Sequence, residues 1–147
     1  PSLRVLEKYA VRVGGGENHR MNLGDGILIK DNHLAALRSR GLSLKEIIAK
    51  ARQNAPKRLK IEVEVKTVPE ALEAAEAGAD IIMLDNMSLG DMRQAVKMIG
   101  GRALIEASGG ITLDRVRAVA ETGVDFISVG ALTHSAKALD ISLELTI

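Results

Sequence analysis

The chain has 147 residues, the size of one ordinary domain, and a chain of this length can bury about 68–70% of its unfolded surface without disulfides. Its 20 Lys and Arg residues balance 19 Asp and Glu residues, which argues against a dedicated nucleic-acid surface. With no cysteine, disulfides and thiolate metal or redox sites are excluded, and its two aromatic residues, Tyr9 and Phe126, are too few for a nucleic-acid stacking platform.

The apolar runs of the sequence are short. Runs such as Ile81–Leu84 end far below the roughly 20 residues that a membrane-spanning helix needs. No basic and then apolar leader opens the chain, and its first residue is Pro1 instead of Met. We therefore expect a soluble cytoplasmic protein without a membrane or nucleic-acid partner, and we expect further sequence before Pro1.

Short β-branched runs alternate with segments in which Ala, Leu, Glu, Lys and Arg recur at helical spacing. In chain order the pattern predicts a helix, a strand, two helices, and then strands and helices in alternation. The predicted strands are Ile27–Ile29, Ile61–Val65, Ile81–Leu84, Ala103–Glu106 and Phe126–Val129, with a further candidate strand at Ile141–Leu145.

Capping signals mark several of the predicted helices. Ser43, Thr67 and Ser88 are each followed three residues later by an acidic residue, which is typical of a helix N-terminus. Pro69 falls in a first helical turn, where its missing N–H costs nothing. The predicted helix stops are Gly78, Gly100–Gly101 and Gly123.

Strands that alternate with helices predict a parallel sheet with right-handed crossovers. A weak internal repeat, in which residues 75–80 (AEAGAD) resemble residues 120–125 (AETGVD), favours a (β/α) barrel over a doubly wound sheet. A closed eightfold barrel takes about 250 residues. We therefore expect an α/β fold that is an open or incomplete, TIM-barrel-like (β/α) barrel.

Charged residues and glycines gather where the predicted strands end, which is where parallel α/β sheets place their functional groups. Each group also has an ordinary structural explanation, such as a solvated edge charge for Glu62 or Glu64, or turn chemistry for Asp85 and Asn86. The candidate residues are His19, Arg20, Lys30, Glu64, Asp85, the turn Ser108-Gly109-Gly110, the pair Gly130-Ala131, and His134.

Together these residues indicate one kind of chemistry. His19, Arg20 and Lys30 suit an acidic substrate. Glu64 and Asp85, which we expect on adjacent strands and in one cavity, suit Mg²⁺, which binds one or two carboxylates and substrate phosphates. Glycine-rich turns suit a terminal phosphate. The residues therefore predict an enzyme that acts on a phosphorylated sugar and a second, anionic substrate, although neither a P-loop nor a His-Glu-x-x-His motif is present.

These motifs, taken together and in order, resemble the quinolinate phosphoribosyltransferase family, a resemblance that covers essentially the whole chain. Each motif alone is weak, and their ordered combination is specific. The motifs are Gly14–Arg20, Leu28–His33, Glu62–Glu64, Met83–Asn86, Glu106–Ile111 and Ser128–His134.

The resemblance implies a two-domain enzyme of NAD biosynthesis that forms a homodimer or a higher homo-oligomer. Quinolinate and phosphoribosyl pyrophosphate would give nicotinate mononucleotide, pyrophosphate and CO₂, with Mg²⁺ as cofactor. Lys30, Glu64 and Asp85 would be the catalytic residues. The resemblance assigns quinolinate to His19, Arg20 and Lys30; Mg²⁺ and the ribose hydroxyls to Glu64 and Asp85; and the phosphates to Ser108, Gly109, Gly110, Gly130, Ala131 and His134.

The sequence departs from the family at its beginning. Family members carry an N-terminal domain and then a Thr-Arg-Lys-Thr segment on the first barrel strand, just before the position of Pro1. We therefore expect residues 1–147 to be the C-terminal barrel domain without its first strand, and inactive alone. The alternatives are a nicotinate-type phosphoribosyltransferase, a molybdenum-transport paralogue, an indole- or thiamin-pathway barrel enzyme, or a catalytically inactive barrel fragment.

Overall fold

The computed structural model describes residues 3–146, which form an α/β fold around one parallel sheet. The five strands lie in the order in which the chain makes them, and every neighbouring pair is parallel. The strands are β1 (Ile27–Ile29), β2 (Ile61–Val65), β3 (Ile81–Asp85), β4 (Leu104–Ser108) and β5 (Phe126–Ile127).

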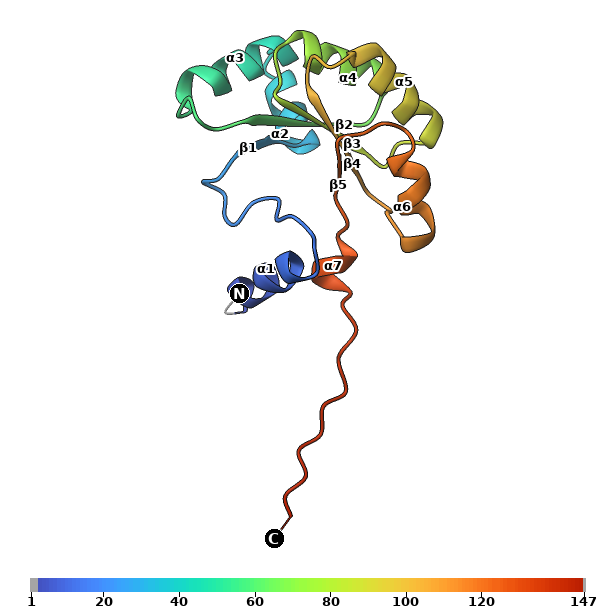
Figure 1. The fold of residues 1–147 in the computed structure, drawn as a ribbon. Coiled ribbons are helices and arrows are strands. Elements are labelled where there is room, and N and C mark those ends of the chain that lie inside the picture. Colours follow the sequence, from blue (N-terminus) through green and yellow to red (C-terminus); the bar gives the residue numbers. More distant parts are fainter. Residues whose placement is uncertain (1–2, 147) are drawn as a thin grey trace.

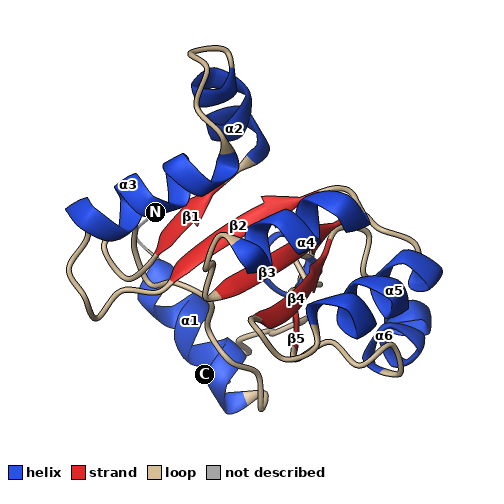
Figure 2. Cartoon of the chain, turned by 90° about the horizontal axis from the view of Figure 1, so that it is seen from above, coloured by secondary structure: helices blue, strands red, loops and turns tan. Residues whose placement is uncertain are grey.

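The helices are divided between the two sides of the sheet (Figures 1 and 2). α3, α4, α5 and α6 cover one face, whereas α1 and α7 lie on the other side. The helices are α1 (Arg4–Val13), α2 (Asp31–Arg38), α3 (Leu44–Asn54), α4 (Val68–Glu76), α5 (Leu89–Ile99), α6 (Leu113–Ala120) and α7 (Ala131–His134).

The strand order decides between the two architectures that the sequence left open. A doubly wound sheet reverses its strand order at a switch point and carries crossover helices on both faces. Here the order is sequential and the crossover helices α3–α6 share one face, as in a (β/α) barrel. The fold is therefore an open (β/α) barrel, as predicted.

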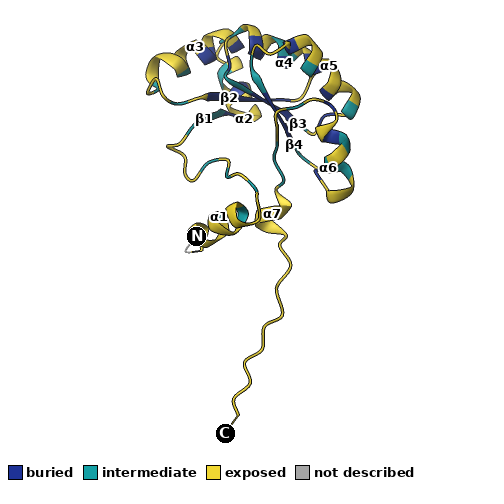
Figure 3. Ribbon diagram, viewed as in Figure 1, coloured by how far each residue is buried: buried dark blue, intermediate teal, exposed yellow. Residues whose placement is uncertain are grey.

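The core lies between the sheet and the covering helices. Because side chains alternate along a strand, Ile61, Val63 and Val65 of β2 all face the helices, where they are at most 2% exposed. Ala71 and Ala74 of α4 are fully buried against this layer, and their small side chains let the helix approach the sheet. Figure 3 shows the resulting band of buried residues along the sheet and the inner sides of the helices.

The predicted capping residues act as expected. The Ser43, Thr67 and Ser88 side chains accept hydrogen bonds from the backbone N–H three residues on, at the starts of α3, α4 and α5. Pro69 lies in the first turn of α4. Gly78, Gly100 and Gly123 take positive φ angles after their helices.

The candidate strand at Ile141–Leu145 is wrong. The chain from Lys137 to Thr146 has no helix or strand, and Figure 1 shows it extending away from the sheet. Leu139, Ile141, Leu143 and Leu145 are 81% to 88% exposed. An alternating pattern suits a strand, but a strand also needs a neighbour for its backbone groups, and this segment has none among the described residues.

The internal repeat has a structural explanation. In each copy of the repeat the last residue, Asp80 or Asp125, lies directly before a strand and forms two hydrogen bonds to the neighbouring strand. Asp80 Oδ2 accepts from the Ile61 N–H at 2.7 Å and its own N–H donates to the Ile61 carbonyl at 2.9 Å. Asp125 makes the same two bonds to Ile105, at 2.8 and 2.9 Å. Each aspartate therefore fixes the register of a parallel pair where the pair begins.

Replacing Asp125 with alanine should leave the Ile105 N–H unpaired in a partly buried position. We expect Asp125→Ala to lower the free energy of unfolding by about 1–3 kcal/mol. The control is Glu121→Ala, because Glu121, at the C-terminal end of α6, forms an exposed ion pair with Arg117 of the same helix. Such a pair contributes about 0.3–0.5 kcal/mol. Urea denaturation measures both, and equal losses in the two variants would contradict the proposed role in register.

Candidate active site

The face of the sheet opposite the covering helices carries buried carboxylates. Glu62 and Glu64 of β2 and Glu106 of β4 are 5%, 8% and 4% exposed. The strand register places Glu64 and Glu106 in one row, on either side of Met83. Buried charge is costly unless it is paired, so this face needs cations beside it.

His19 supplies one of these cations. The segment between α1 and β1 brings its ring to the sheet, where Nε2 lies 2.8 Å from Glu62 Oε2 and 3.9 Å from Glu106 Oε2. Ser128 donates from Oγ to Glu106 Oε1 at 2.5 Å. Glu62 Oε1 is buried and has no hydrogen-bond partner among the described residues. One imidazole thus joins the acids of two strands that are not neighbours.

The electrostatics of this cluster favour a protonated histidine. The hydrogen bond to Glu62 raises the pKa of His19 above its ordinary value, with burial and Arg20 opposing the shift. Burial raises the pKa of Glu106, and the nearby Glu62 carboxylate adds to this. His19 therefore keeps its positive charge to a higher pH than a solvated histidine does.

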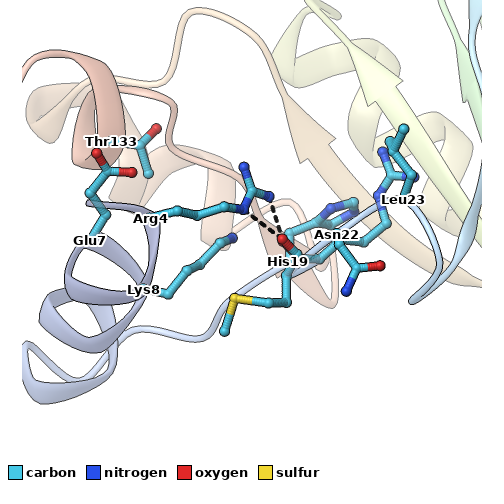
Figure 4. Close-up of a pocket in the computed structure, with 9 residues that line it drawn as sticks. Arg4, Glu7, Lys8, His19, Asn22, Leu23 and Thr133 are labelled. Atoms are coloured by element: carbon cyan, nitrogen blue, oxygen red, sulfur yellow. Dashed lines mark hydrogen bonds between the residues drawn. The ribbon is translucent and has the colours of Figure 1, made fainter. Parts of the chain in front are cut away.

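A cavity of about 700 Å³ lies between α1, residues 19–23 and α7. Figure 4 shows Arg4 and Lys8 extending from α1 toward the segment that carries His19. Arg4 donates from Nε to the Met21 carbonyl at 2.5 Å, which ties α1 to this segment. Four basic residues line the cavity, namely Arg4, Lys8, His19 and Arg20, together with the acid Glu7.

The predicted cations fall in two places. His19 and Arg20 line the cavity, and Arg20 also donates to the Gly26 carbonyl at 3.3 Å. Lys30 does not line it; its Nζ lies 3.7 Å from Glu64 Oε2 at the end of β1. Arg4 and Lys8 were not among the candidates predicted from the sequence. Their i, i+4 spacing in a predicted helix, which places both on one face, was the signal that could have identified them.

Glu64 and Asp85 lie on adjacent strands, as predicted, because β2 pairs with β3. The shared cavity is not seen: Glu64 lines a smaller cavity of about 120 Å³, and Asp85 lines neither of the two described cavities. Asp85 Oδ1 accepts from Asn86 Nδ2 at 2.9 Å. Both side chains offer the oxygen donors that Mg²⁺ prefers, so the donor set fits this ion.

The predicted phosphate turns follow β4 and β5, which are adjacent strands. Gly109 and Gly110 take φ angles of +84° and +60°, and the Asn86 side chain packs directly over Gly109. His134 packs in the same way over Gly130, where an added Cβ would lie 2.8 Å from its Nε2. Both turns thus depend on a glycine that leaves room for a polar side chain.

Gly109 and Gly78 form a matched pair for testing this packing, because their φ angles are +84° and +85°. At Gly78 nothing lies within 4 Å of an added Cβ, so Gly78→Ala should cost only the left-handed strain, about 1–2 kcal/mol. At Gly109 the added Cβ would lie 2.4 Å from Asn86 Oδ1. We expect Gly109→Ala to destabilise the protein more than Gly78→Ala in thermal or urea unfolding.

A double-mutant cycle separates the clash from the strain. In an Asn86→Ala background, Gly109→Ala should cost no more than Gly78→Ala does in the wild type. An equal cost of Gly109→Ala in both backgrounds would show that Asn86 is not the obstacle.

Fold and site together define a (β/α)-barrel domain with a basic cavity beside buried acids. Residues 1–144 match the family model described as quinolinate phosphoribosyl transferase, C-terminal domain. The chain therefore belongs to the quinolinate phosphoribosyltransferase family.

Known proteins similar to the chain agree with this assignment. It is 52% identical over 147 residues to the Bacillus subtilis protein named probable nicotinate-nucleotide pyrophosphorylase (carboxylating), covering 100% of this chain and 50% of that protein. It is 45% identical over 160 residues to quinolinate phosphoribosyltransferase (decarboxylating) 2a, mitochondrial, of Nicotiana tabacum, covering 99% of the chain and 45% of that protein.

Among solved structures, NadC from Streptococcus pyogenes superposes with a TM-score of 0.86 at 52% identity, covering 98% of this chain and 49% of that one. The chain thus spans about half the length of the relatives that it matches. None of the helices between residues 3 and 146 has the length and apolarity to cross a bilayer.

Proposed function

We propose that this chain is the C-terminal barrel domain of an enzyme that transfers phosphoribosyl from phosphoribosyl pyrophosphate to quinolinate with decarboxylation. The products are nicotinate mononucleotide, pyrophosphate and CO₂. The observation that carries this proposal is the basic cavity lined by Arg4, Lys8, His19 and Arg20. Family membership and the names of the relatives support the same reaction.

The cavity suits a small dicarboxylate. Two carboxylates can each be met by more than one cation, and charge-assisted hydrogen bonds from Arg are about twice as strong as neutral ones. Nicotinate would bring a single carboxylate to the same four basic residues. The surplus of positive charge over that single carboxylate favours the dicarboxylate.

The acids of the sheet suit the other substrate. As pyrophosphate leaves, C1 of the ribose gains positive charge, and Glu64 and Asp85 near the ribose would stabilise that charge where it develops. The same two residues would hold Mg²⁺, which when bound neutralises charge on the pyrophosphate. Lys30, 3.7 Å from Glu64, would link this region to the quinolinate carboxylates.

The turns after β4 and β5 would bind the terminal phosphate of the sugar. Ser108, Gly109 and Gly110 would present backbone N–H groups and a hydroxyl, and Gly130 and Ala131 would present further backbone N–H groups after the next strand. His134, which packs over Gly130, would lie beside the phosphates. The basic cavity would hold the ring nitrogen of quinolinate toward C1, which supplies the proximity contribution.

Once its ring nitrogen is alkylated, the pyridine is cationic. Its positive charge can then stabilise the electron pair left at C2 when the carboxylate on that carbon leaves as CO₂, and C2 takes up a proton from solvent to give nicotinate mononucleotide, so the decarboxylation needs no cofactor of its own.

The full-length protein tests the proposal directly. Purified protein with Mg²⁺, phosphoribosyl pyrophosphate and quinolinate should release CO₂ and form nicotinate mononucleotide in equal amounts. Product formed from nicotinate but not from quinolinate would replace this function with the nicotinate-type one, and product from neither would favour the transport paralogue or a catalytically inactive protein. We expect a homodimer or a higher homo-oligomer in the cytoplasm, and little turnover by residues 1–147 alone.

Asp85 and Glu64 should be linked to the metal. Asp85→Asn keeps the size of the side chain and removes its charge, so turnover should fall about tenfold or more and the dependence on Mg²⁺ should weaken. Steady-state rates against Mg²⁺ concentration measure this for Asp85→Asn and Glu64→Gln. Unchanged metal dependence in both variants would remove Glu64 and Asp85 from the metal site.

Arg20 should act on one substrate and not on the other. Arg20→Ala removes a charge-assisted bond to a carboxylate, so quinolinate binding should weaken by about 1.5–3 kcal/mol while binding of phosphoribosyl pyrophosphate barely changes. Titration calorimetry with each substrate measures this, with the exposed Arg40→Ala as control. Equal weakening for both substrates would mean that Arg20 mainly holds its own loop through the Gly26 carbonyl.

A further inference from the structure

His19 is held from one edge of its ring. Its Nε2 is bonded to Glu62, and no residue in the described part of the chain forms a hydrogen bond with Nδ1. The side chain is 35% exposed and lines the basic cavity, whereas the Glu62 side chain is 6% exposed. The imidazole therefore lies between the buried acids of the sheet and the cavity. Its Nε2 binds the Glu62 carboxylate, and its Nδ1 is left for another partner.

A second acid, Glu106, also lies beside the His19 ring. Glu106 lies 3.9 Å from His19 Nε2 and accepts the Ser128 hydroxyl on its other oxygen. Two carboxylates thus face one imidazole, and a buried carboxylate is stabilised far better by a cation than by a neutral ring. The charged neighbours of His19 are Glu62 from β2, Glu106 from β4 and Arg20 from its own segment. Across the cavity lie the α1 residues Arg4, Glu7 and Lys8.

Anchoring the loop does not by itself require a carboxylate at Glu62. A glutamine could accept the same hydrogen bond without the desolvation cost of a buried charge. Glu62 also leaves Oε1 without a partner among the described residues, a further cost that a purely structural contact does not explain. The charge of Glu62 is explained if it sets the state of the ring that it holds.

We propose that Glu62, with a smaller contribution from Glu106, is a positioning residue that keeps His19 cationic and leaves its Nδ1–H to donate to an anionic group in the cavity. This inference rests on the proposed function only for the identity of that anion, quinolinate. Because His19 must carry a proton to act in this way, anion affinity should fall as pH rises through the His19 titration. Removing the Glu62 charge should move that fall to lower pH.

The first measurement needs no substrate. Full-length protein with ¹³C-labelled histidine is titrated by NMR, and the His19 signal is assigned by its loss in His19→Gln. The wild-type ring should titrate above the ordinary histidine value of about 6.5, whereas Glu62→Gln should lower its pKa. Glu121→Gln, which removes an exposed charge on α6's C-terminal cap, is the matched control and should leave the titration unchanged.

The second measurement separates a charge effect from a structural one. Quinolinate affinity is measured by calorimetry between about pH 6 and pH 9, where an imidazole changes its charge. Glu62→Gln should bind almost as well as the wild type at the acid end and several-fold more weakly toward the alkaline end, because its ring loses its proton at a lower pH than the wild-type ring does. A merely structural role would weaken binding equally at every pH.

A further variant covers the case in which Glu62→Gln does not fold normally. If Glu62→Gln does not show the wild-type melting temperature, Glu106→Gln is used, since its amide can still accept from Ser128. It should shift the His19 titration in the same direction but by less, because Glu106 is the more distant acid.

Three results would overturn the inference. One is a His19 titration that neither variant changes, and another is an equal loss of affinity at every pH. The third is a bound divalent cation: His19, Glu62 and Glu106 place their ligand atoms within 4.8 Å of one another. Zn²⁺ or Mn²⁺ that binds the wild type and not Glu62→Gln would make this cluster a metal site instead. If the NMR shift is found but quinolinate does not bind at any pH, the proposed substrate fails while the role of Glu62 in holding the charge stands.

Discussion

The alternation of side chains along the strands places two different environments on the two faces of one sheet. On β2 the odd-numbered residues Ile61, Val63 and Val65 enter the apolar layer beneath the helices, while Glu62 and Glu64 are forced to the opposite face. A shift of one residue in register would bury both glutamates in the apolar core. The register bonds of Asp80 and Asp125 therefore protect the site as much as the fold.

Buried acids on one face require cations from elsewhere in the chain. These come from the segment before β1, through His19, and from the end of β1, through Lys30. Helix α1 extends the same arrangement, because Arg4 and Lys8 lie on the side of the cavity away from the sheet. The net charge of +1 does not indicate that basic and acidic residues lie in separate layers, because the charges of the two layers cancel in the sum.

Local features of the fold were predictable from the sequence, because each is decided within a few residues. The caps at Ser43, Thr67 and Ser88 and the turn at Gly78 depend only on their own turns of chain. The bond between His19 and Glu62 joins residues 43 positions apart, and no local pattern indicates it. The wrong strand at Ile141–Leu145 has the same cause, since alternation shows what a segment can do and not whether a neighbouring strand is present.

Asn86 shows how closely the separate parts of the candidate site are built together. It has a φ angle of +54°, the one positive value outside glycine in residues 3–146, and such a conformation is costly unless the surroundings require it. Its N–H donates to the Ser108 carbonyl, and its side chain both donates to Asp85 and packs over Gly109. One residue thus joins the proposed metal carboxylate to the proposed phosphate turn. The strain at Asn86 is explained by this double role, because a residue in extended conformation at the end of β3 would carry its side chain away from Gly109.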